Sequence, residues 1–313
     1  MKAAVLHERD GVPRYEDFPD PVAGEGEVVV EVVAVAVENV DRAVAAGTHF
    51  AGRAMMPELP AIPCFDGIGT LPDGRLVGFG NPRPPYGALA ERTVVAEGAY
   101  APIPEGLDPA AATVLPSAIT GMSMKIAAGL APGESVLIQG ATGVAGRLAV
   151  QVARLLGAGK VVATGRDDEQ LRGLGADEVI NTTLSDEDLL QAFKAARTDV
   201  VVDFLWGRPT EILLRAMVPD TFAFPKPLRL VQIGEVAGAD LRLPAESLRT
   251  SGVEIYGAAK GLGPETMGAA YGQVVEWAQA GKLTFGLERV PLRDIEAAWQ
   301  RTDLRGTRLV VEP

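Results

Sequence analysis

Three glycines mark the segment of this sequence whose residue types and spacing point most directly to chemistry. Gly140, Gly143 and Gly146 lie between a β-branched run, SVLIQ, and a long run with apolar residues at helical spacing, VAGRLAVQVARLL. This order predicts a strand, a tight turn and a helix, followed by a second strand at KVVATG. Such a turn lets backbone approach a pyrophosphate and points helix N–H groups, with the positive end of the helix dipole, towards it. The segment therefore predicts a dinucleotide site, and the alternative is a plain turn of an α/β domain that binds no ligand.

The end of the second predicted strand bears on which dinucleotide is bound. Gly165 leaves space there, and Arg166 offers a fork of N–H donors that suits a 2′-phosphate. Sites for NAD instead place an acidic residue about 20 residues beyond the glycines to bond the ribose hydroxyls, and Asp167 and Asp168 are alternatives for that role. A third alternative is that all three charged side chains are simply solvated at a helix start. We favour NADPH as the cofactor, with Arg166 as the discriminating residue.

The composition limits the partners and the location of the protein. The chain has 313 residues, 29 Lys plus Arg and 41 Asp plus Glu, which gives a net charge of −12 and argues against a nucleic-acid partner. Cys64 is the only cysteine, so no intramolecular disulfide can form. The start MKAAVLHERDG is too short in apolar residues for a signal peptide core, and no window reaches the roughly 18 apolar residues of a spanning helix. We expect a cytoplasmic protein with no membrane contact.

The elements that must position these residues change in character along the chain. The first third reads as strands broken by Pro and Gly, with a hairpin turn at Asp73-Gly74. From about Pro116 onward, strand and helix patterns alternate, and the strands are apolar without alternation. Such strands are typical of a parallel sheet covered on both faces, and the length of the chain favours two domains. The fold class is therefore α/β.

A family resemblance becomes specific at this point. The segments ENVDRAVAAGTHF, LPAIPCFDGIGT, YGALAERTVV, APGESVLIQGATGVAGRLAVQVARLLGA, LGADEVINT and GTRLVV are similar to those of the zinc-independent medium-chain dehydrogenase/reductases, in the quinone oxidoreductase (zeta-crystallin-like) branch. A motif of this family is matched from Ala141 to Gly146, which accounts for the alanine at the usual first glycine position. The resemblance implies a doubly wound Rossmann domain inserted into a GroES-like, mainly β catalytic domain, with the active site in their cleft. It implies domain bounds of 1–115 and 257–313 for the catalytic domain and 116–256 for the NADP-binding domain, and a homodimer.

The same resemblance supplies the set of residues expected at the cofactor. Thr120 matches the helix before the cofactor domain, where it abuts the nicotinamide, and Gly234 is expected near the carboxamide. The tyrosine frequent in the family after the strand ending VIN is absent, since Thr182 and Thr183 follow Asn181. The expected cofactor-binding residues are Thr120, Gly140, Ala141, Thr142, Gly143, Val144, Ala145, Gly146, Gly165, Arg166 and Gly234.

No metal site is expected. A four-cysteine structural zinc is excluded by the single cysteine, and the positions that hold catalytic zinc in the family's zinc enzymes fall at Asn39 and at Cys64-Phe65-Asp66. The alternative is an improvised site made of His49, Cys64 and Asp66, whose spacing matches no known ligand pattern. Without a Lewis acid, hydride delivery suits an acceptor that is already electrophilic, namely a quinone or an α,β-unsaturated carbonyl.

His49 and Asn39 are the expected catalytic residues. The resemblance places His49 where enoyl reductases of the superfamily have a tyrosine that faces the nicotinamide, and imidazole can donate a proton or a hydrogen bond to an enolate; the alternative is a loop histidine without a role. Asn39 is expected to bond the acceptor oxygen or the nicotinamide ribose, and Asp41 to cap the following helix. The segment from Phe50 to Met56, together with Trp206, suggests an apolar substrate. The alternative functions are an enoyl-thioester reductase and a dinucleotide-binding protein with negligible catalysis.

Overall fold

The chain folds into two compact units. The computed structural model describes residues 1–221 and 226–313; unit 1 consists of Met1–Leu115 and Gly286–Pro313, and unit 2 of Pro116–Phe285. In sequence, unit 2 is therefore inserted between the two segments that form unit 1. Unit 2 extends beyond residue 257, where the sequence suggested a return to the first domain. Near the end of this extension the Gln151 side chain accepts from the Thr284 N–H (2.7 Å) and donates to its carbonyl (2.8 Å).

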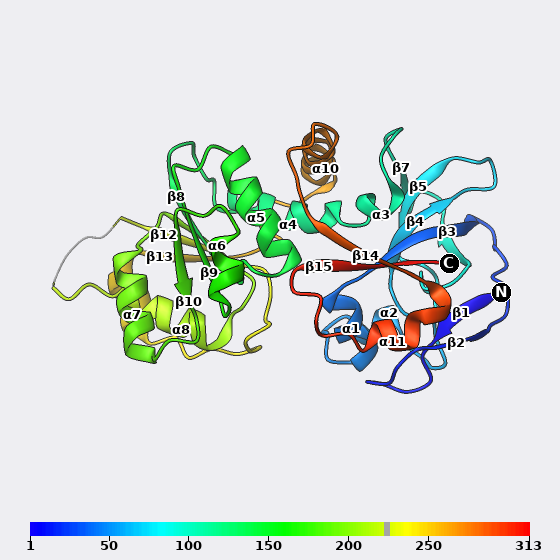
Figure 1. The fold of residues 1–313 in the computed structure, drawn as a ribbon, viewed down its shortest axis with the longest axis horizontal. Coiled ribbons are helices and arrows are strands. Elements are labelled where there is room, and N and C mark those ends of the chain that lie inside the picture. Colours follow the sequence, from blue (N-terminus) through cyan, green and yellow to red (C-terminus); the bar gives the residue numbers. More distant parts are fainter. Residues whose placement is uncertain (222–225) are drawn as a thin grey trace. The chain divides into compact units, whose positions relative to one another are not determined.

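Unit 2 is built on a parallel sheet of six strands in the order β10-β9-β8-β11-β12-β13 (Figure 1). Counted along the chain this order is 3-2-1-4-5-6, the doubly wound arrangement in which ligands bind at the carboxyl ends of the strands where the order reverses. Here the reversal lies between β8 (Ser135–Gln139) and β11 (Val200–Asp203). The apolar residues of these two strands are buried, as the non-alternating sequence pattern requires.

Helices cover both faces of this sheet. Figure 1 shows α7 (Asp186–Ala195) and α8 (Gly207–Ala216) side by side on one face. Phe193 and Leu213 of these helices pack with Leu137, Val162 and Val201 of the sheet in one apolar core. The helix α5 (Val144–Leu155), which follows the glycine turn, packs on β8 and β9. The remaining elements of unit 2 are α4 (Leu115–Ile126), β9 (Lys160–Gly165), α6 (Asp168–Arg172), β10 (Glu178–Asn181), β12 (Leu228–Gln232), α9 (Ala245–Ser251), β13 (Val253–Gly257) and α10 (Pro264–Gln279).

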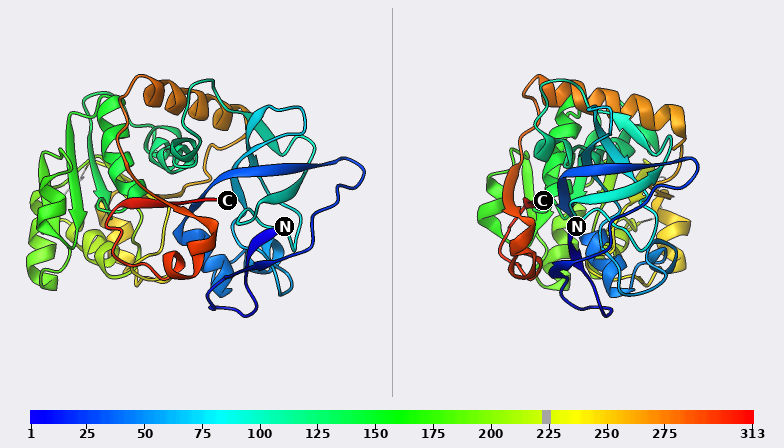
Figure 2. Two further views of the ribbon diagram at one scale, coloured as in Figure 1. Left: turned by 45° about the vertical axis from the view of Figure 1, so that its right-hand side comes forward. Right: turned by 90° about the vertical axis from the view of Figure 1, so that its right-hand side faces the viewer.

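Unit 1 is mainly β. Its largest sheet runs β14-β15-β3-β4-β5-β7, with β6 also paired to β3, and the long β3 (Glu27–Val37) can be followed in Figure 2. The predicted hairpin is present, since β4 (Asp66–Thr70) and β5 (Leu76–Gly80) are antiparallel and Gly74 takes a positive φ of 86°. The other elements are β1 (Lys2–Val5), β2 (Arg14–Asp17), α1 (Asn39–Ala46), α2 (Gly52–Met55), β6 (Arg92–Ala96), β7 (Tyr100–Pro102), α3 (Pro109–Ala112), β14 (Gly286–Pro291), a 3₁₀ turn (Leu292–Asp294), α11 (Ile295–Trp299) and β15 (Thr307–Glu312).

These two units confirm the predicted fold class, since one contains a parallel Rossmann-type sheet and the other is a separate, mainly β domain. Within the described ranges, no helix is long and apolar enough to cross a membrane.

Candidate active site

The glycine turn joins β8 to α5 in the geometry that a diphosphate requires. Gly140 takes a φ of +79°, and Gly143 is the N-cap of α5 with extended backbone and no side chain to cap the helix. The N–H groups of the first helical turn, at Val144, Ala145 and Gly146, therefore have no intrahelical acceptor. A helix start of this kind presents unsatisfied donors and positive dipole to an anion.

Close packing explains why these positions are glycines. A Cβ at Gly146 would lie 2.2 Å from the Gly140 carbonyl oxygen, so only glycine lets α5 approach the end of β8 this closely. A Cβ at Gly140 would lie 2.9 Å from the Leu205 side chain. The turn is held to the neighbouring strand, because the Ala141 N–H donates to the Thr164 carbonyl at 2.8 Å.

The end of β9 lies directly beside the glycine turn. A Cβ at Gly165 would be 2.7 Å from the Thr142 methyl group, so the two predicted positions are neighbours in space. The next residue, Arg166, is exposed, and no described residue forms a hydrogen bond or ion pair with its guanidinium. The two aspartates that follow are both engaged. Asp167 accepts the backbone N–H groups of the first turn of α6, and Asp168 accepts the Asn181 amide at 2.7 Å.

Gly234 and Thr120 occupy other parts of unit 2. Gly234 follows β12, where its N–H donates to the Asp203 carbonyl (3.2 Å) and a Cβ would lie 2.7 Å from the Phe204 carbonyl oxygen. It therefore lies at the carboxyl edge of the sheet together with Gly140. Thr120 lies within α4, half-buried, and its hydroxyl donates to the Ser117 carbonyl at 2.7 Å.

A buried polar network under this edge was missed at the sequence level. The Asp203 carboxylate, fully buried at the end of β11, accepts the Leu205 N–H (2.9 Å), the Trp206 N–H (3.0 Å) and the Thr210 hydroxyl (2.6 Å). The Thr210 oxygen accepts in turn from the Gln139 amide at 3.0 Å. Burial raises the pKa of Asp203, while these donors lower it. The network holds a turn in which Trp206 takes a φ of +54°. The only feature of the sequence that could have indicated this network is the aspartate at the end of the run VVVD.

Arg147 was also missed. It follows the last glycine, and its guanidinium donates to the Thr142 carbonyl (2.9 Å) and to the Gln170 side-chain oxygen (2.9 Å). The sequence shows a basic residue in the first turn of the predicted helix, but its hydrogen bond to Gln170 of α6 could not be predicted from the sequence.

In unit 1, Asn39 and His49 lie near opposite ends of α1. Asn39 is its exposed first residue, so the helix begins before Asp41 and not after it, as the sequence suggested. Asp41 is the third helical residue, and its carboxylate accepts the N–H of the N-cap residue Glu38 at 2.8 Å in a capping box. His49 follows the last turn, where its N–H donates to the Ala43 carbonyl at 3.2 Å. The helix α1 between them has eight residues and is about 12 Å long.

The hydrogen bonds of His49 define its tautomer. Nδ1 accepts the Ala51 N–H at 3.3 Å, so the proton of the neutral ring lies on Nε2. The ring stacks at 4.4 Å on Phe50, which is 95% exposed. His49 can therefore present an N–H donor, with an exposed aromatic surface beside it.

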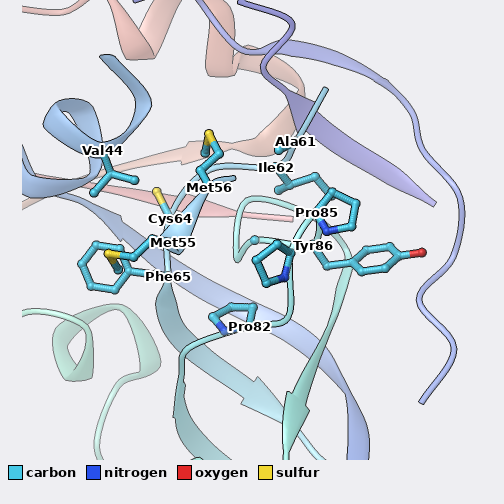
Figure 3. A pocket seen from close by; sticks show the side chains of 12 residues that line it. Val44, Met55, Met56, Ala61, Ile62, Cys64, Phe65, Pro82, Pro85 and Tyr86 are labelled. Atoms are coloured by element: carbon cyan, nitrogen blue, oxygen red, sulfur yellow. The ribbon is translucent and has the colours of Figure 1, made fainter. Parts of the chain in front are cut away.

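A small pocket in unit 1 combines apolar and acidic surroundings. Met55, Met56, Cys64 and Phe65 line it (Figure 3), so two of the residues expected to meet an apolar substrate lie here, whereas Phe50 does not. Burial, followed by the nearby carboxylates of Asp41 and Asp66, raises the pKa of the Cys64 thiol well above its usual range. The thiol therefore stays protonated.

Asp66 has a raised pKa of about 7, because burial and the Glu38 carboxylate disfavour its ionised form more than Arg308 favours it. Throughout the part of the chain that the structure describes, no three His, Cys, Asp or Glu residues are placed to hold a metal ion. His49, Cys64 and Asp66 are thus not brought together as a ligand set.

Comparison with known proteins identifies the family. No family model matches the chain. It is 26% identical over 352 aligned positions to the probable NADPH-dependent quinone reductase tdiC of Emericella nidulans, which covers 96% of both chains. It is 34% identical to the 2-methylene-furan-3-one reductase of Solanum lycopersicum, over 65% of this chain and 59% of that one.

A solved structure also matches over the full length. The quinone oxidoreductase of Thermus thermophilus, also determined as a complex with NADPH, is 30% identical and superimposes with a TM-score of 0.76 over 100% of both chains. Together with the glycine turn at the switch point of the sheet, this similarity confirms the resemblance drawn from the sequence. The chain belongs to the medium-chain dehydrogenase/reductase family, in its quinone oxidoreductase (zeta-crystallin-like) branch.

Proposed function

We propose that this protein is an NADPH-dependent oxidoreductase that transfers hydride to a quinone or to the C=C bond of an α,β-unsaturated carbonyl. The observation that carries the proposal is the glycine turn, whose first helical N–H groups have no intrahelical acceptor, next to the exposed Arg166. Relatives named as a probable NADPH-dependent quinone reductase, a 2-methylene-furan-3-one reductase and an NADPH-dependent alkenal/one oxidoreductase support the same reaction.

The cofactor would be held by unit 2. The N–H groups at the start of α5 would donate to the diphosphate, and the exposed Arg166 would pair with the 2′-phosphate as a bidentate donor. Bound NADPH supplies the hydride. The engaged carboxylates of Asp167 and Asp168 leave the 2′-phosphate without an opposing free acid.

The acceptor would be activated by unit 1. Reduction of a quinone or enone takes one hydride and one proton, and negative charge develops on the carbonyl oxygen before the proton arrives. The Nε2–H of His49 is a suitable donor to that oxygen. Asn39, the first residue of α1, would bond the acceptor oxygen or the nicotinamide ribose.

The alternatives receive less support. Enoyl-thioester reduction would require a basic patch for a phosphopantetheine or CoA substrate. Arg42, a basic residue of α1, instead donates to the Trp299 carbonyl and lies over that ring. A dinucleotide-binding role without catalysis is disfavoured by the named activities of the relatives.

The proposal is tested by following NADPH absorbance with phenanthrenequinone and with a simple enone as acceptors. We expect turnover with at least one acceptor class and NADPH binding by calorimetry. NADPH binding with no turnover across both classes would favour the binding-protein alternative, and no binding of either pyridine nucleotide would end the proposal.

Three further properties belong to the proposal. We propose that the enzyme is a cytoplasmic homodimer that needs no catalytic zinc, as the resemblance implies. Light scattering should give twice the mass of the chain, and dialysis against a chelator should leave turnover unchanged. A monomer, or activity restored by zinc alone, would contradict the respective statement.

A further inference from the structure

The loop between α1 and α2 exposes a large aromatic side chain to solvent. Phe50 is 95% exposed, whereas Phe79 and Trp299, two other aromatic residues of unit 1, are 4% and 7% exposed. A phenyl ring in water lacks the favourable free energy of burial that those two side chains gain. The packing of unit 1 therefore gives no reason for an aromatic residue at this position.

The backbone on both sides of Phe50 is fixed by hydrogen bonds. The His49 N–H donates to the Ala43 carbonyl at 3.2 Å, and the Gly52 N–H donates to the His49 carbonyl at 2.9 Å. The Ala51 N–H donates to Nδ1 of His49 at 3.3 Å, which links the imidazole to the residue after Phe50. The phenyl ring is thus presented from an anchored turn, as is common for binding residues on loops.

The ring of Phe50 lies beside the N–H donor of His49. The centroids of the two rings are 4.4 Å apart, and the angle between their planes is 38°. Among the described residues, none forms a hydrogen bond with Nε2 of His49, and His49 provides the only ring contact of Phe50. The loop therefore combines a hydrogen-bond donor with an adjacent, exposed aromatic surface.

A quinone suits this pair of groups better than an aliphatic enone does. Its carbonyl oxygen lies at the edge of a flat ring and can accept the Nε2–H of His49, while the electron-poor ring is attracted to the negative face of a phenyl ring. Offset-stacked and edge-to-face pairs have centroids about 4.5–7 Å apart, so a quinone can contact the exposed side of Phe50. An aliphatic enone offers the same oxygen but has no ring for this contact.

We propose that Phe50 is a specificity-determining residue that contacts the ring of an acceptor whose carbonyl oxygen is bound by His49, and so makes a quinone the preferred acceptor over an aliphatic enone. The inference rests on the proposed oxidoreductase function and narrows its substrate class. Phe50 contributes to binding of the acceptor, whereas His49 acts on the developing oxyanion. Substitutions of the two residues should therefore change different kinetic constants.

Phe50→Leu tests the ring separately from apolar character, because leucine keeps an apolar side chain of similar size. With NADPH as donor, we expect KM for phenanthrenequinone to rise by about three- to tenfold, the size of one aromatic pair, with kcat nearly unchanged. KM for an aliphatic enone, methyl vinyl ketone, should stay nearly unchanged. Phe50→Tyr keeps the ring and should retain the wild-type preference for the quinone.

Two measurements separate specificity from general damage. Val22→Ala shortens another apolar side chain of unit 1, one that is 76% exposed, and should change KM for neither acceptor. Because the side chain of Phe50 is exposed, Phe50→Leu and Phe50→Tyr should leave the midpoint of urea unfolding unchanged.

Equal changes of KM for the two acceptors in Phe50→Leu, no change for either, or loss of the preference in Phe50→Tyr would overturn the inference. A wild-type enzyme that reduces the enone and not the quinone would do the same. A smaller mass of Phe50→Leu than of the wild type in light scattering would assign the ring to an interface between two copies and would also overturn it. In all these cases the wild-type enzyme is active. A wild-type protein that reduces neither acceptor would instead refute the proposed function, and this inference with it.

Discussion

At the scale of single residues, the site depends on which donors and acceptors already have partners. Asp167 and Asp168 form hydrogen bonds within unit 2. Among the described residues, none forms a hydrogen bond or ion pair with the guanidinium of Arg166, which precedes them. In unit 1 the Nδ1 atom of His49 accepts a backbone N–H, so its other nitrogen becomes the donor. Both features concern single hydrogen bonds, and each gives a prediction.

His49→Ala should slow turnover more than it weakens cofactor binding. Removing a proton or hydrogen-bond donor from the developing oxyanion should lower kcat by about 100-fold, with the dissociation constant for NADPH nearly unchanged. Steady-state kinetics and calorimetry separate the two effects. His7→Ala is the matched control, since His7 is exposed and bonds only to Glu16 at 2.8 Å. An undiminished kcat in His49→Ala would remove this residue from the mechanism.

Arg166→Ala should weaken the binding of NADPH and leave the binding of NADH nearly unchanged. The loss of a bidentate pair with the 2′-phosphate should raise the dissociation constant for NADPH by about 10- to 100-fold, because charge-assisted bonds are worth about 1.5–3 kcal/mol. Arg172→Ala, also exposed and on the neighbouring α6, serves as the control. If NADH lost as much affinity as NADPH, the arginine would have no role in recognising the 2′-phosphate.

At the scale of elements, close backbone approach fixes the geometry of the site. The glycine turn, the strand end at Gly165 and the turn at Leu205 meet with separations that admit no Cβ. These contacts align the free N–H groups of α5 with the carboxyl edge of the sheet. The prediction that belongs here compares two helical glycines.

Gly146→Ala and Gly272→Ala should act in opposite directions. A Cβ at Gly146 would lie 2.2 Å from a carbonyl oxygen, so α5 must shift, at a cost of about 1–3 kcal/mol, and NADPH binding should be lost with it. At Gly272, exposed within α10, nothing lies within 4 Å, and alanine should stabilise the helix by up to about 1 kcal/mol. Urea unfolding with calorimetry of NADPH measures both. A neutral Gly146→Ala would show that the close approach is dispensable.

The local structure of this fold could be predicted from the sequence, whereas the contacts between distant segments could not. The glycine turn, the strands on either side of it and the Asp73-Gly74 hairpin follow from spacing and backbone preference within a few residues. Two other features depend on rotamers and on contacts between elements distant in sequence. They are the buried network of Asp203, Thr210 and Gln139, and the hydrogen bond from Arg147 to Gln170. The extent of unit 2 beyond residue 257 likewise involves contacts between segments distant in sequence, among them the hydrogen bonds of Gln151 to Thr284.

At the scale of the whole molecule, buried carboxylates make the stability of the protein depend on pH. Asp66 has a pKa of about 7 in the folded state, above the ordinary value near 4, and the pKa of the buried Asp41 is raised as well. Between these values the folded state binds more protons than the unfolded state. The free energy of unfolding contributed by Asp66 is therefore present at low pH and is lost as pH rises from about 4 to about 7.

Asp66→Asn should reduce this loss. A residue that cannot ionise removes the cost of burying the charge, so the fall in unfolding free energy between pH 5 and pH 8 should shrink by about 2 kcal/mol, allowing for partial exposure of the side chain. Asp41 acts with the same sign and should leave part of the slope in place. Urea unfolding at both pH values gives the comparison, with the exposed Glu58→Gln as control. A steeper fall in Asp66→Asn would mean that ionised Asp66 stabilises the fold.

The pairing of β15 with β3 has a consequence for the order of events during synthesis. Leu309 to Val311 pair with Val35 to Val37, so the edge of β3 lacks this neighbour until the ribosome has added residues 307–312. All residues of unit 2, in contrast, precede Gly286. Unit 2 can therefore complete its sheet while the chain is still being synthesised. In unit 1, the edge of β3 that pairs with β15 stays unpaired until synthesis reaches the last strand.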